Sequence, residues 1–228
     1  MAVALFDLDR TLIDCNSGRL WLALEWREGR VGIRDAAWAS YILLQYSLGY
    51  GELDAAYNAA VAKYAGIPEV DIDTRTRDWF AREVAHRLRP GARAAVEQHR
   101  KQGDRLVIAT SSTMYAGQQA AAAFGFETTI ASRFEVAEDG RFTGKVSHSA
   151  FGANKLTRVA EWAEREGVLL SDCTFYTDSA SDLALMEKVG HPVAVNPDRA
   201  LAKIALARNW PIVDWGLSVS GAAAAANP

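Results

Sequence analysis

The stretch VALFDLDRTLID, from Val3 to Asp14, decides the fold that we predict for this chain. Its apolar residues form a short run that ends in two aspartates, Asp7 and Asp9, with one residue between them. A short apolar run bounded by polar residues is typical of a buried strand, so we predict a strand over residues 2–7. Because residues i and i+2 of a strand point to the same side, the two carboxylates can share a face if the strand geometry persists past the apolar part.

Similar short strands alternate with helical patterns through the second half of the chain. The expected strands read DRLVIATSS (104–112), CTFYTDSASD (173–182), HPVAVNPD (191–198) and PIVDW (211–215). The expected helices each end at a glycine, which is common just past a last helical turn, and they read PGARAAVEQHRKQG (90–103), SSTMYAGQQAAAAFG (111–125), NKLTRVAEWAEREG (154–167) and SDLALMEKVG (181–190). This alternation predicts an α/β fold with a Rossmann-like, doubly wound parallel sheet and helices on both of its faces.

Residues 15–87 interrupt the alternation, because helical patterns follow one another there without strands between them. The patterns read GRLWLALEWREG (18–29), IRDAAWASYILLQYSLGY (33–50), GELDAAYNAAVAKYAG (51–66) and VDIDTRTRDWFAREVAHRL (70–88). We interpret residues 15–87 as an inserted all-helical domain, and residues 1–14 and 88–228 as the core. Most aromatic side chains of the insert are expected to form a small bundle core, and a few to line a cleft that faces the sheet.

A second interruption is EDGRF, from Glu138 to Phe142, which lies between two β-like runs at 134–137 and 142–146. The dipeptide Asp-Gly is frequent in the tight turns that join antiparallel strands. We therefore predict a β-hairpin that is added to the sheet.

The composition is that of an ordinary globular protein, and it limits the partners of the chain. Of its 228 residues 50% are hydrophobic and 23% are charged, and the net charge of -3 does not favour nucleic acid or an anionic membrane surface. No apolar stretch reaches the length of a membrane span, so we expect no stable membrane insertion. No pattern typical of a secretion leader precedes the first strand. Cys15 and Cys173 are spaced neither like a disulfide framework nor like a metal site. We therefore expect a cytoplasmic protein. The oligomeric state is not predicted.

Asp7 and Asp9 are placed where open α/β sheets bind their ligands, at the carboxyl end of a parallel strand. Two carboxylates so close repel each other, and one keeps its proton unless a cation lies between them. Mg²⁺ removes this repulsion, because it prefers carboxylate, carbonyl and water oxygens. Aspartate at a strand end also serves ordinary turn chemistry, and the pair alone does not decide between the two interpretations.

Two further groups of residues, around Thr110 and at Lys155, can bind an anion. VIATSS ends a strand in Thr110, Ser111 and Ser112, which can offer hydroxyl and backbone N–H donors to an anion, and the helix after it adds its N-terminal dipole. Lys155 lies near the start of a helix, where a positive charge opposes the usual dipole preference, and this indicates an anion to be neutralised. Each has a structural alternative, because Ser112 or Thr113 can cap the helix and a lysine can be a solvated surface residue.

An acidic turn completes the candidate residues. In YTDSASD, Asp178 and Asp182 lie on either side of a strand-to-helix turn. One can ligate a metal while the other orients a neighbouring ligand. The alternative is that Asp178, Ser179 or Ser181 caps the following helix.

Taken in order, these four pieces resemble the motifs of the haloacid dehalogenase superfamily of phosphohydrolases. DLDRT resembles the first motif, D-x-D-x-T; VIATSS resembles the second, Lys155 the third and YTDSASD the fourth. The resemblance covers roughly residues 2–14 and 88–214. The insert between the first and second motifs, FTGKV before Lys155 and VAVNPD after the fourth motif are similar to subfamily IB, the branch that includes phosphoserine phosphatase and has a helical cap of the C1 type.

The resemblance implies a phosphatase that hydrolyses a small phosphorylated metabolite through an aspartyl-phosphate intermediate, with Mg²⁺ as its cofactor. By motif position, Asp7 is the catalytic nucleophile, and Asp9 is the catalytic acid that later acts as a base. The carboxylates of Asp7 and Asp178 and the backbone carbonyl of Asp9 are the implied metal ligands, and Asp182 supports them. The helical insert would close over the substrate as a lid.

The same resemblance assigns Thr110, Ser111 and Lys155 to the phosphoryl oxygens, and Thr110 and Lys155 count among the catalytic residues. Two alternatives stay open: a phosphotransferase that passes the aspartyl-phosphate to an alcohol, and, ranked lower, a non-catalytic module that binds Mg²⁺ and phosphate. Such a module would lack one of the residues Asp7, Asp9 or Lys155, and all three are present.

Four residues of the insert are candidates for substrate recognition. Asn16 and Ser17 follow the first motif and are expected near the mouth of the site, and Arg75 and Arg77 can bind a carboxylate or a second phosphate. In the phosphoserine phosphatases that the chain resembles, the position aligned with Asn16 holds an acidic residue, which binds the substrate amine. Asn16 has no charge for an ammonium group, and this argues against phosphoserine. A solvated helix face is an equally good interpretation of the two arginines.

Overall fold

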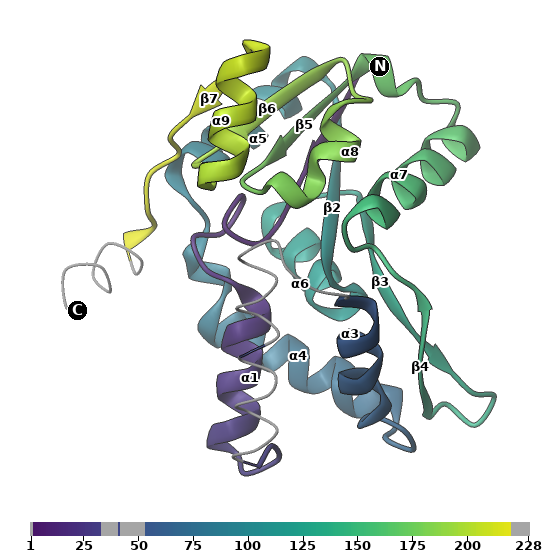
Figure 1. The fold of residues 1–228 in the computed structure, drawn as a ribbon. Coiled ribbons are helices and arrows are strands. Elements are labelled where there is room, and N and C mark those ends of the chain that lie inside the picture. Colours follow the sequence, from purple (N-terminus) through teal and green to yellow (C-terminus); the bar gives the residue numbers. More distant parts are fainter. Residues whose placement is uncertain (1, 33–40, 42–52, 220–228) are drawn as a thin grey trace.

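The computed structural model describes residues 2–32, 41 and 53–219, and a seven-stranded sheet forms its centre (Figure 1). The order of strands is β4-β3-β2-β1-β5-β6-β7, and every neighbouring pair is parallel except β3 and β4. The strands are β1 (Val3–Phe6), β2 (Arg105–Thr113), β3 (Thr128–Val136), β4 (Phe142–His148), β5 (Cys173–Thr177), β6 (His191–Val195) and β7 (Ile212–Val213). The predicted α/β fold with a doubly wound parallel sheet is confirmed.

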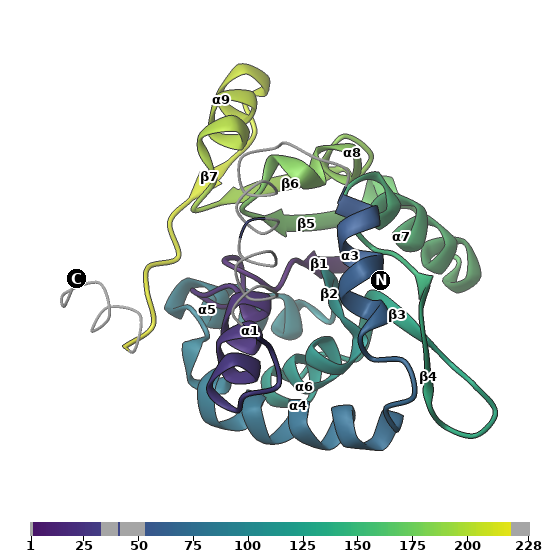
Figure 2. The ribbon, with the colours of Figure 1, turned by 60° about the horizontal axis from the view of Figure 1, so that its bottom comes forward.

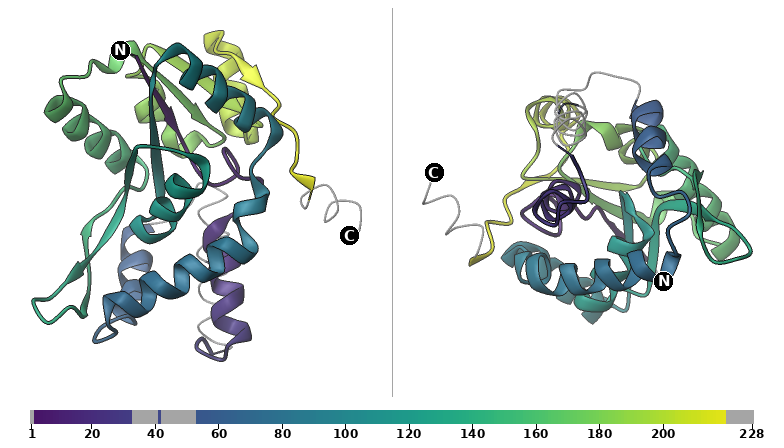
Figure 3. Two further views of the ribbon diagram at one scale, coloured as in Figure 1. Left: turned by 180° about the vertical axis from the view of Figure 1, so that it is seen from behind. Right: turned by 90° about the horizontal axis from the view of Figure 1, so that it is seen from below.

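Helices cover both faces of this sheet (Figure 3). They are α5 (Pro90–Gln102) and α6 (Met114–Phe124) on one face, and α7 (Ala153–Glu166), α8 (Leu183–Met186) and α9 (Arg199–Arg208) on the other. The central strand explains this arrangement, because its side chains alternate between the two layers. Ala4 and Phe6 pack with α5 and α6, whereas Val3 and Leu5 pack with α7, α8 and α9.

Three of the four predicted helix ends are confirmed, since Gly103, Gly125 and Gly167 follow α5, α6 and α7 with positive φ angles. The prediction for Gly190 is wrong, because α8 already ends at Met186. The N–H of Gly190 donates to the carbonyl of Leu170 at 3.1 Å, and a Cβ at this position would lie 1.8 Å from the carbonyl oxygen of Ser171. Glycine is needed there because two backbones approach each other closely.

The helices of the insert lie beyond the carboxyl ends of β1 and β2 (Figures 1 and 2). They are α1 (Ser17–Arg27), α3 (Leu53–Ala62) and α4 (Glu69–Glu83), followed by a 3₁₀ turn at Ala85–Arg87. The helix predicted over 33–50 lies outside the described residues except for position 41. Trp79 and Phe80 of α4 join the apolar layer that contains Phe6, so these rings of the insert belong to the sheet core and not to a separate bundle core. The boundaries 1–14, 15–87 and 88–228 stay a prediction.

The predicted hairpin is confirmed, because β3 and β4 pair in antiparallel fashion. The turn between them contains Gly140 at φ 76°. The hairpin contacts the insert: the ring of Tyr64 lies 5.8 Å from that of Phe134 and 6.3 Å from that of Phe142, between centroids. The insert, the hairpin and the carboxyl ends of the central strands therefore meet in one region.

Candidate active site

Asp7 and Lys155 form a buried ion pair at the carboxyl end of β1. The N–H of Asp7 donates to the carbonyl of Tyr176 at 2.9 Å, which extends the contact between β1 and β5 by one residue. Lys155, in the first turn of α7, donates from Nζ to Oδ1 of Asp7 and to Oδ2 of Asp182, both at 2.8 Å. Its side chain is buried, so the alternative that Lys155 is a solvated surface lysine does not hold. Three predicted residues thus meet at one point.

Burial and charge act in opposite directions on this pair. The pKa of Asp7 is raised to about 7: burial is the largest cause, the nearby carboxylates of Asp182 and Asp9 contribute, and the attraction of Lys155 acts against them. Burial by itself would lower the pKa of Lys155, but Asp182 and Asp7 raise it above its ordinary value. The ammonium group therefore stays charged and is the local counter-ion for these carboxylates.

The acidic turn after β5 completes this buried cluster. Oδ1 of Asp178 accepts a hydrogen bond from the hydroxyl of Thr11 at 3.4 Å, and this bond joins the loop after Asp9 to the acidic turn. Burial raises the pKa of Asp178, and the charges of Asp7 and Asp182 raise it further. Oδ2 of Asp182 also accepts from Thr177 at 2.6 Å, whereas its Oδ1 is buried without a hydrogen-bond partner in the described part of the chain.

The donor set fits a divalent cation of the magnesium type. Asp182 raises the pKa of Asp7, Asp7 and Asp182 raise the pKa of Asp178, and Lys155 supplies a positive charge beside Asp7 and Asp182. Buried negative charge without compensation is costly, and a bound cation removes that cost. Within the described residues no group of three or more His, Cys, Asp or Glu side chains forms a metal cluster by itself. The predicted ligands include only two side chains, and Mg²⁺ commonly takes few carboxylates and keeps several waters.

Asp9 lies in a different environment from Asp7. Its Oδ1 accepts from the N–H of Ser17, and its Oδ2 accepts from the hydroxyls of Ser17 at 3.0 Å and Ser112 at 2.8 Å. Those two hydroxyl oxygens are 2.9 Å apart. Burial raises the pKa of Asp9, and the bonds from Ser17 and Ser112 lower it. Asp7 is thus held by a charged partner and Asp9 mainly by neutral donors.

The hydroxyls at the end of β2 have separate roles. Oγ1 of Thr110 accepts from the N–H of Ser112 at 3.1 Å, so its own proton can still be donated. The hydroxyl of Ser111 donates to the carbonyl of Ala150 at 3.0 Å, so its proton is not available to an anion. Thr113 is the N-cap of α6 and accepts from the N–H of Ala116 at 3.3 Å, as one of the alternatives predicted.

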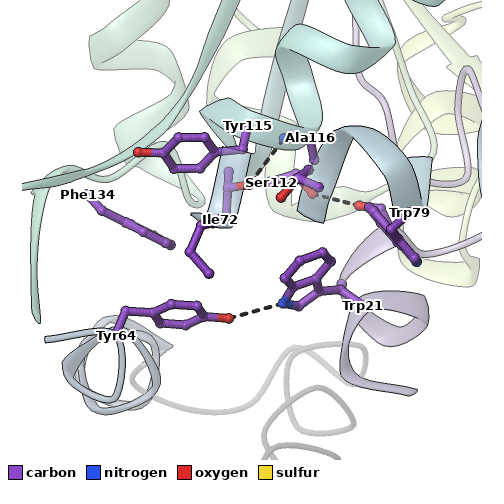
Figure 4. A pocket seen from close by; sticks show the side chains of 12 residues that line it. Trp21, Tyr64, Ile72, Trp79, Ser112, Tyr115, Ala116 and Phe134 are labelled. Atoms are coloured by element: carbon purple, nitrogen blue, oxygen red, sulfur yellow. Dashed lines mark hydrogen bonds between the residues drawn. The ribbon is translucent and has the colours of Figure 1, made fainter. Parts of the chain in front are cut away.

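A pocket of about 90 Å³ lies beside Asp9, and we call it the aromatic pocket (Figure 4). Ser17 and Ser112, the two serines that bind Asp9, are part of its wall. Figure 4 shows the rings of Tyr115 and Phe134 from the core, and of Trp21, Tyr64 and Trp79 from the insert, around it. Its lining residues are Ser17, Gly18, Trp21, Tyr64, Ile72, Thr76, Trp79, Ser112, Thr113, Tyr115, Ala116 and Phe134.

Of the predicted recognition residues, only Ser17 lines this pocket. Asn16 is the N-cap of α1, and its Oδ1 accepts from the N–H of Arg19 at 2.9 Å. Arg75 pairs with Glu25, and its guanidinium lies 5.2 Å above the ring of Trp21, behind the pocket wall. The side chain of Arg77 is 57% exposed. The structure therefore does not bring Asn16, Arg75 or Arg77 into the pocket.

Trp21, Tyr64 and Trp79 line the pocket, in agreement with the prediction that a few aromatic side chains of the insert line a cleft, but the sequence reasoning did not name them and missed the rings that the core contributes. Tyr115 and Phe134 lie in the predicted core, on α6 and β3, and nothing in their local sequence indicates that they face the insert.

The two cysteines, Cys15 and Cys173, are free. None of the helices among residues 2–32 and 53–219 has the length and apolar character needed to span a membrane.

Comparisons with known proteins agree on one family. The model of haloacid dehalogenase-like hydrolases matches residues 4–187. The chain is 33% identical to the Inhibition of morphological differentiation protein of Streptomyces azureus, over 93% of this chain and 78% of that protein. It is 29% identical to the Histidinol-phosphatase of Neisseria meningitidis serogroup C, over 93% of this chain and 98% of that protein.

Solved structures share the fold. A Bordetella pertussis protein of unknown function has a TM-score of 0.84 and 29% identity, over 94% of this chain and 98% of that one. A phosphoserine phosphatase bearing a phospho-aspartyl intermediate analogue has a TM-score of 0.67 and 17% identity, over 96% of this chain and 95% of that one. At that identity the second likeness concerns the fold alone.

Proposed function

This chain belongs to the haloacid dehalogenase-like hydrolases, and from that membership we propose a Mg²⁺-dependent phosphomonoesterase that acts on a small phosphorylated metabolite through an aspartyl-phosphate. It is an enzyme of the phosphatase type. The observation that carries the finer proposal is the contrast between two carboxylates two residues apart. Asp7 is paired with the buried Lys155, whereas Asp9 is held by the hydroxyls of Ser17 and Ser112.

This contrast suits the two roles that phosphoryl transfer through a carboxylate requires. A nucleophile must be ionised and a general acid must carry a proton, so the environments must separate two otherwise equal groups. Lys155 holds Oδ1 of Asp7, and we assign the attack on phosphorus to Oδ2. We assign to Asp9 the protonation of the leaving alcohol and, afterwards, the removal of a proton from the attacking water.

The remaining residues bind and orient the phosphoryl group. We assign the Thr110 hydroxyl, the Ser111 N–H and Lys155 to its oxygens, where negative charge must be stabilised during transfer. Asp182 holds Lys155 in position through Oδ2. Asp7, Asp178 and the backbone carbonyl of Asp9 would hold the metal. When bound, Mg²⁺ supplies positive charge that neutralises the phosphoryl oxygens.

The names of the relatives supply candidate substrates. One relative is named Histidinol-phosphatase and another, from Mycobacterium tuberculosis, Phosphoserine phosphatase SerB1. We therefore propose the phosphate ester of a small alcohol, and both histidinol phosphate and phosphoserine belong in a phosphate-release screen. Phosphatidylglycerol phosphate extends the screen to a larger, lipid-like phosphate ester.

The proposed function is tested by p-nitrophenyl phosphate hydrolysis in Mg²⁺. The variant Asp7→Asn should lose at least about 10³-fold in kcat, as expected when a covalent nucleophile is removed. Asp78→Asn is the matched control, because it makes the same change of aspartate to asparagine at a side chain that is 64% exposed. Substantial turnover by Asp7→Asn would overturn the assignment of the nucleophile.

A further inference from the structure

The position of the aromatic pocket relates it to the leaving group. Ser17 and Ser112 line the pocket, and both donate hydrogen bonds to Asp9. In the proposed reaction Asp9 protonates the leaving oxygen, so that oxygen must come within hydrogen-bond distance of its carboxylate. The rest of the alcohol then lies next to the two serines, in the aromatic pocket. The wall of this pocket consequently selects the alcohol.

That wall consists mainly of rings. Trp21 of α1, Trp79 of α4, Tyr115 of α6 and Phe134 of β3 come from four elements, and Tyr64 follows α3. Trp21 and Trp79 meet edge to face, with centroids 5.2 Å apart and planes at 82°. Aromatic pairs prefer edge-to-face or offset contacts, and such surroundings offer both faces and edges to another ring.

The described lining residues carry no charge. The nearby charged groups are engaged elsewhere: Glu69 accepts from the hydroxyl of Tyr115 at 2.7 Å, and Arg75 pairs with Glu25. The alcohol part of phosphoserine carries both an ammonium and a carboxylate. Burying either group against a neutral wall costs free energy without compensation, so this wall disfavours such an alcohol.

The size of the pocket limits the alcohol further. Its volume is about 90 Å³, which is smaller than the engineered cavity of about 150 Å³ that holds benzene. A single ring that is partly inserted, or a short apolar chain, matches this space. A nucleoside or a pair of acyl chains is too large for it. Among the two occupants that fit, the ring gains the additional contacts with the aromatic wall.

We propose that the substrate is a phosphate monoester of a short alcohol that bears one small, neutral aromatic or heteroaromatic ring, and that this ring binds in the aromatic pocket. This inference rests on the proposed phosphomonoesterase function and specifies its substrate class. It favours ring-bearing alcohols over the doubly charged alcohol of phosphoserine.

The test compares three esters with wild-type enzyme and Mg²⁺: 2-phenylethyl phosphate, n-butyl phosphate and phosphoserine. The value of kcat/KM should be about 10-fold higher for the ring ester than for the butyl ester, and about 100-fold higher than for phosphoserine. A preference for phosphoserine, or equal values for all three esters, would overturn the ring pocket and leave the phosphatase function standing. If the enzyme hydrolyses neither these three esters nor p-nitrophenyl phosphate, the proposed function is wrong and the inference fails with it.

Variants locate the preference in the pocket. Trp21→Leu keeps an apolar side chain and removes a ring, so it should bring the ring-to-butyl ratio of kcat/KM down to about one. Trp26→Leu, on the same helix but 44% exposed and outside the pocket, should keep the wild-type ratio. Phe134→Leu, from β3, repeats the test if Trp21→Leu does not fold. An unchanged ratio in a folded pocket variant would contradict the assignment of this pocket to the ring.

Discussion

Replacing Lys155 by methionine should remove several kcal/mol of folding free energy when divalent cations are absent. Its Nζ contacts both Asp7 and Asp182 at 2.8 Å, and its side chain is 2% exposed. Methionine keeps most of the apolar stem but leaves two buried carboxylates without their counter-ion. Removing one partner of a buried ion pair costs about 3–5 kcal/mol, and in a protein of this size the corresponding fall in Tm is about 6–20 °C.

The pH dependence of this loss has a defined sign. The pKa of Asp7 is raised to about 7, with burial as the largest cause, whereas an unfolded aspartate has a pKa of about 4. The folded protein therefore holds this proton more tightly, and the resulting stabilisation is complete below about pH 4 and is lost as the pH rises through about 7. Lys155 opposes the effect of burial, so without it the pKa of Asp7 rises further. The difference in unfolding free energy between Lys155→Met and wild type should consequently grow as the pH rises above about 7.

Urea unfolding in EDTA, followed by tryptophan fluorescence, measures this difference. Lys188→Met is the matched control, because Lys188 is exposed and its replacement should change the unfolding free energy by no more than about 0.5 kcal/mol. If Lys155→Met unfolds within about 1 kcal/mol of wild type at pH 8, Lys155 is not the counter-ion of these carboxylates and the reasoning fails.

Three further outcomes are expected. EDTA should abolish phosphate release and added Mg²⁺ should restore it; full activity in EDTA would exclude the metal. Ser112→Ala removes one of the donors to Asp9 and should lower kcat about 10-fold, since one hydrogen bond to a charged group is worth about 1.5–3 kcal/mol; an unchanged kcat would show that Asp9 needs no such support. Burial raises the pKa of Cys15 to about 12 and of Cys173 to about 11, so both are mostly thiols at pH 8, and iodoacetamide should modify them at least about 100-fold more slowly in the native protein than in urea; equal rates would contradict this.

The sheet could be predicted because its signals are local. A run such as Val3–Phe6 is short, apolar and bounded by polar residues, and it needs no knowledge of distant parts of the chain. The end of α8 could not be predicted in this way. Gly190 resembles a helix C-cap in sequence, but its structural role depends on Ser171, which is 19 positions earlier in the chain.

In the candidate site, too, local motifs could be predicted and contacts between distant residues could not. The order of motifs indicated Asp7, Lys155 and Asp182, and the structure places these three in direct contact. The partners of Asp9 were not predicted as a group, since Ser112 was considered as a donor to an anion or as a helix cap, and Ser17 as a recognition residue. Their meeting requires the turn after β1 to approach the end of β2, and a sequence pattern contains no information on that approach.

The lining of the aromatic pocket was the least predictable part. Asn16 was singled out by its place after the first motif, yet its amide oxygen caps α1. The pocket wall is instead assembled from rings such as Trp21 and Phe134, which are 113 positions apart in the chain. Aromatic residues on helices and strands usually fill cores, so single positions do not reveal which of them face a ligand.

The central claim is that Asp7 attacks phosphorus and carries the phosphoryl group. It is tested most directly by a single turnover of a phosphate ester in Mg²⁺, acid quench within milliseconds, and mass spectrometry of the peptide that contains residues 3–14. We predict a phosphoryl group on Asp7 that forms before phosphate is released and is absent in Asp7→Asn. Release of phosphate without a covalent intermediate, or a phosphoryl group on any other residue, would contradict the account.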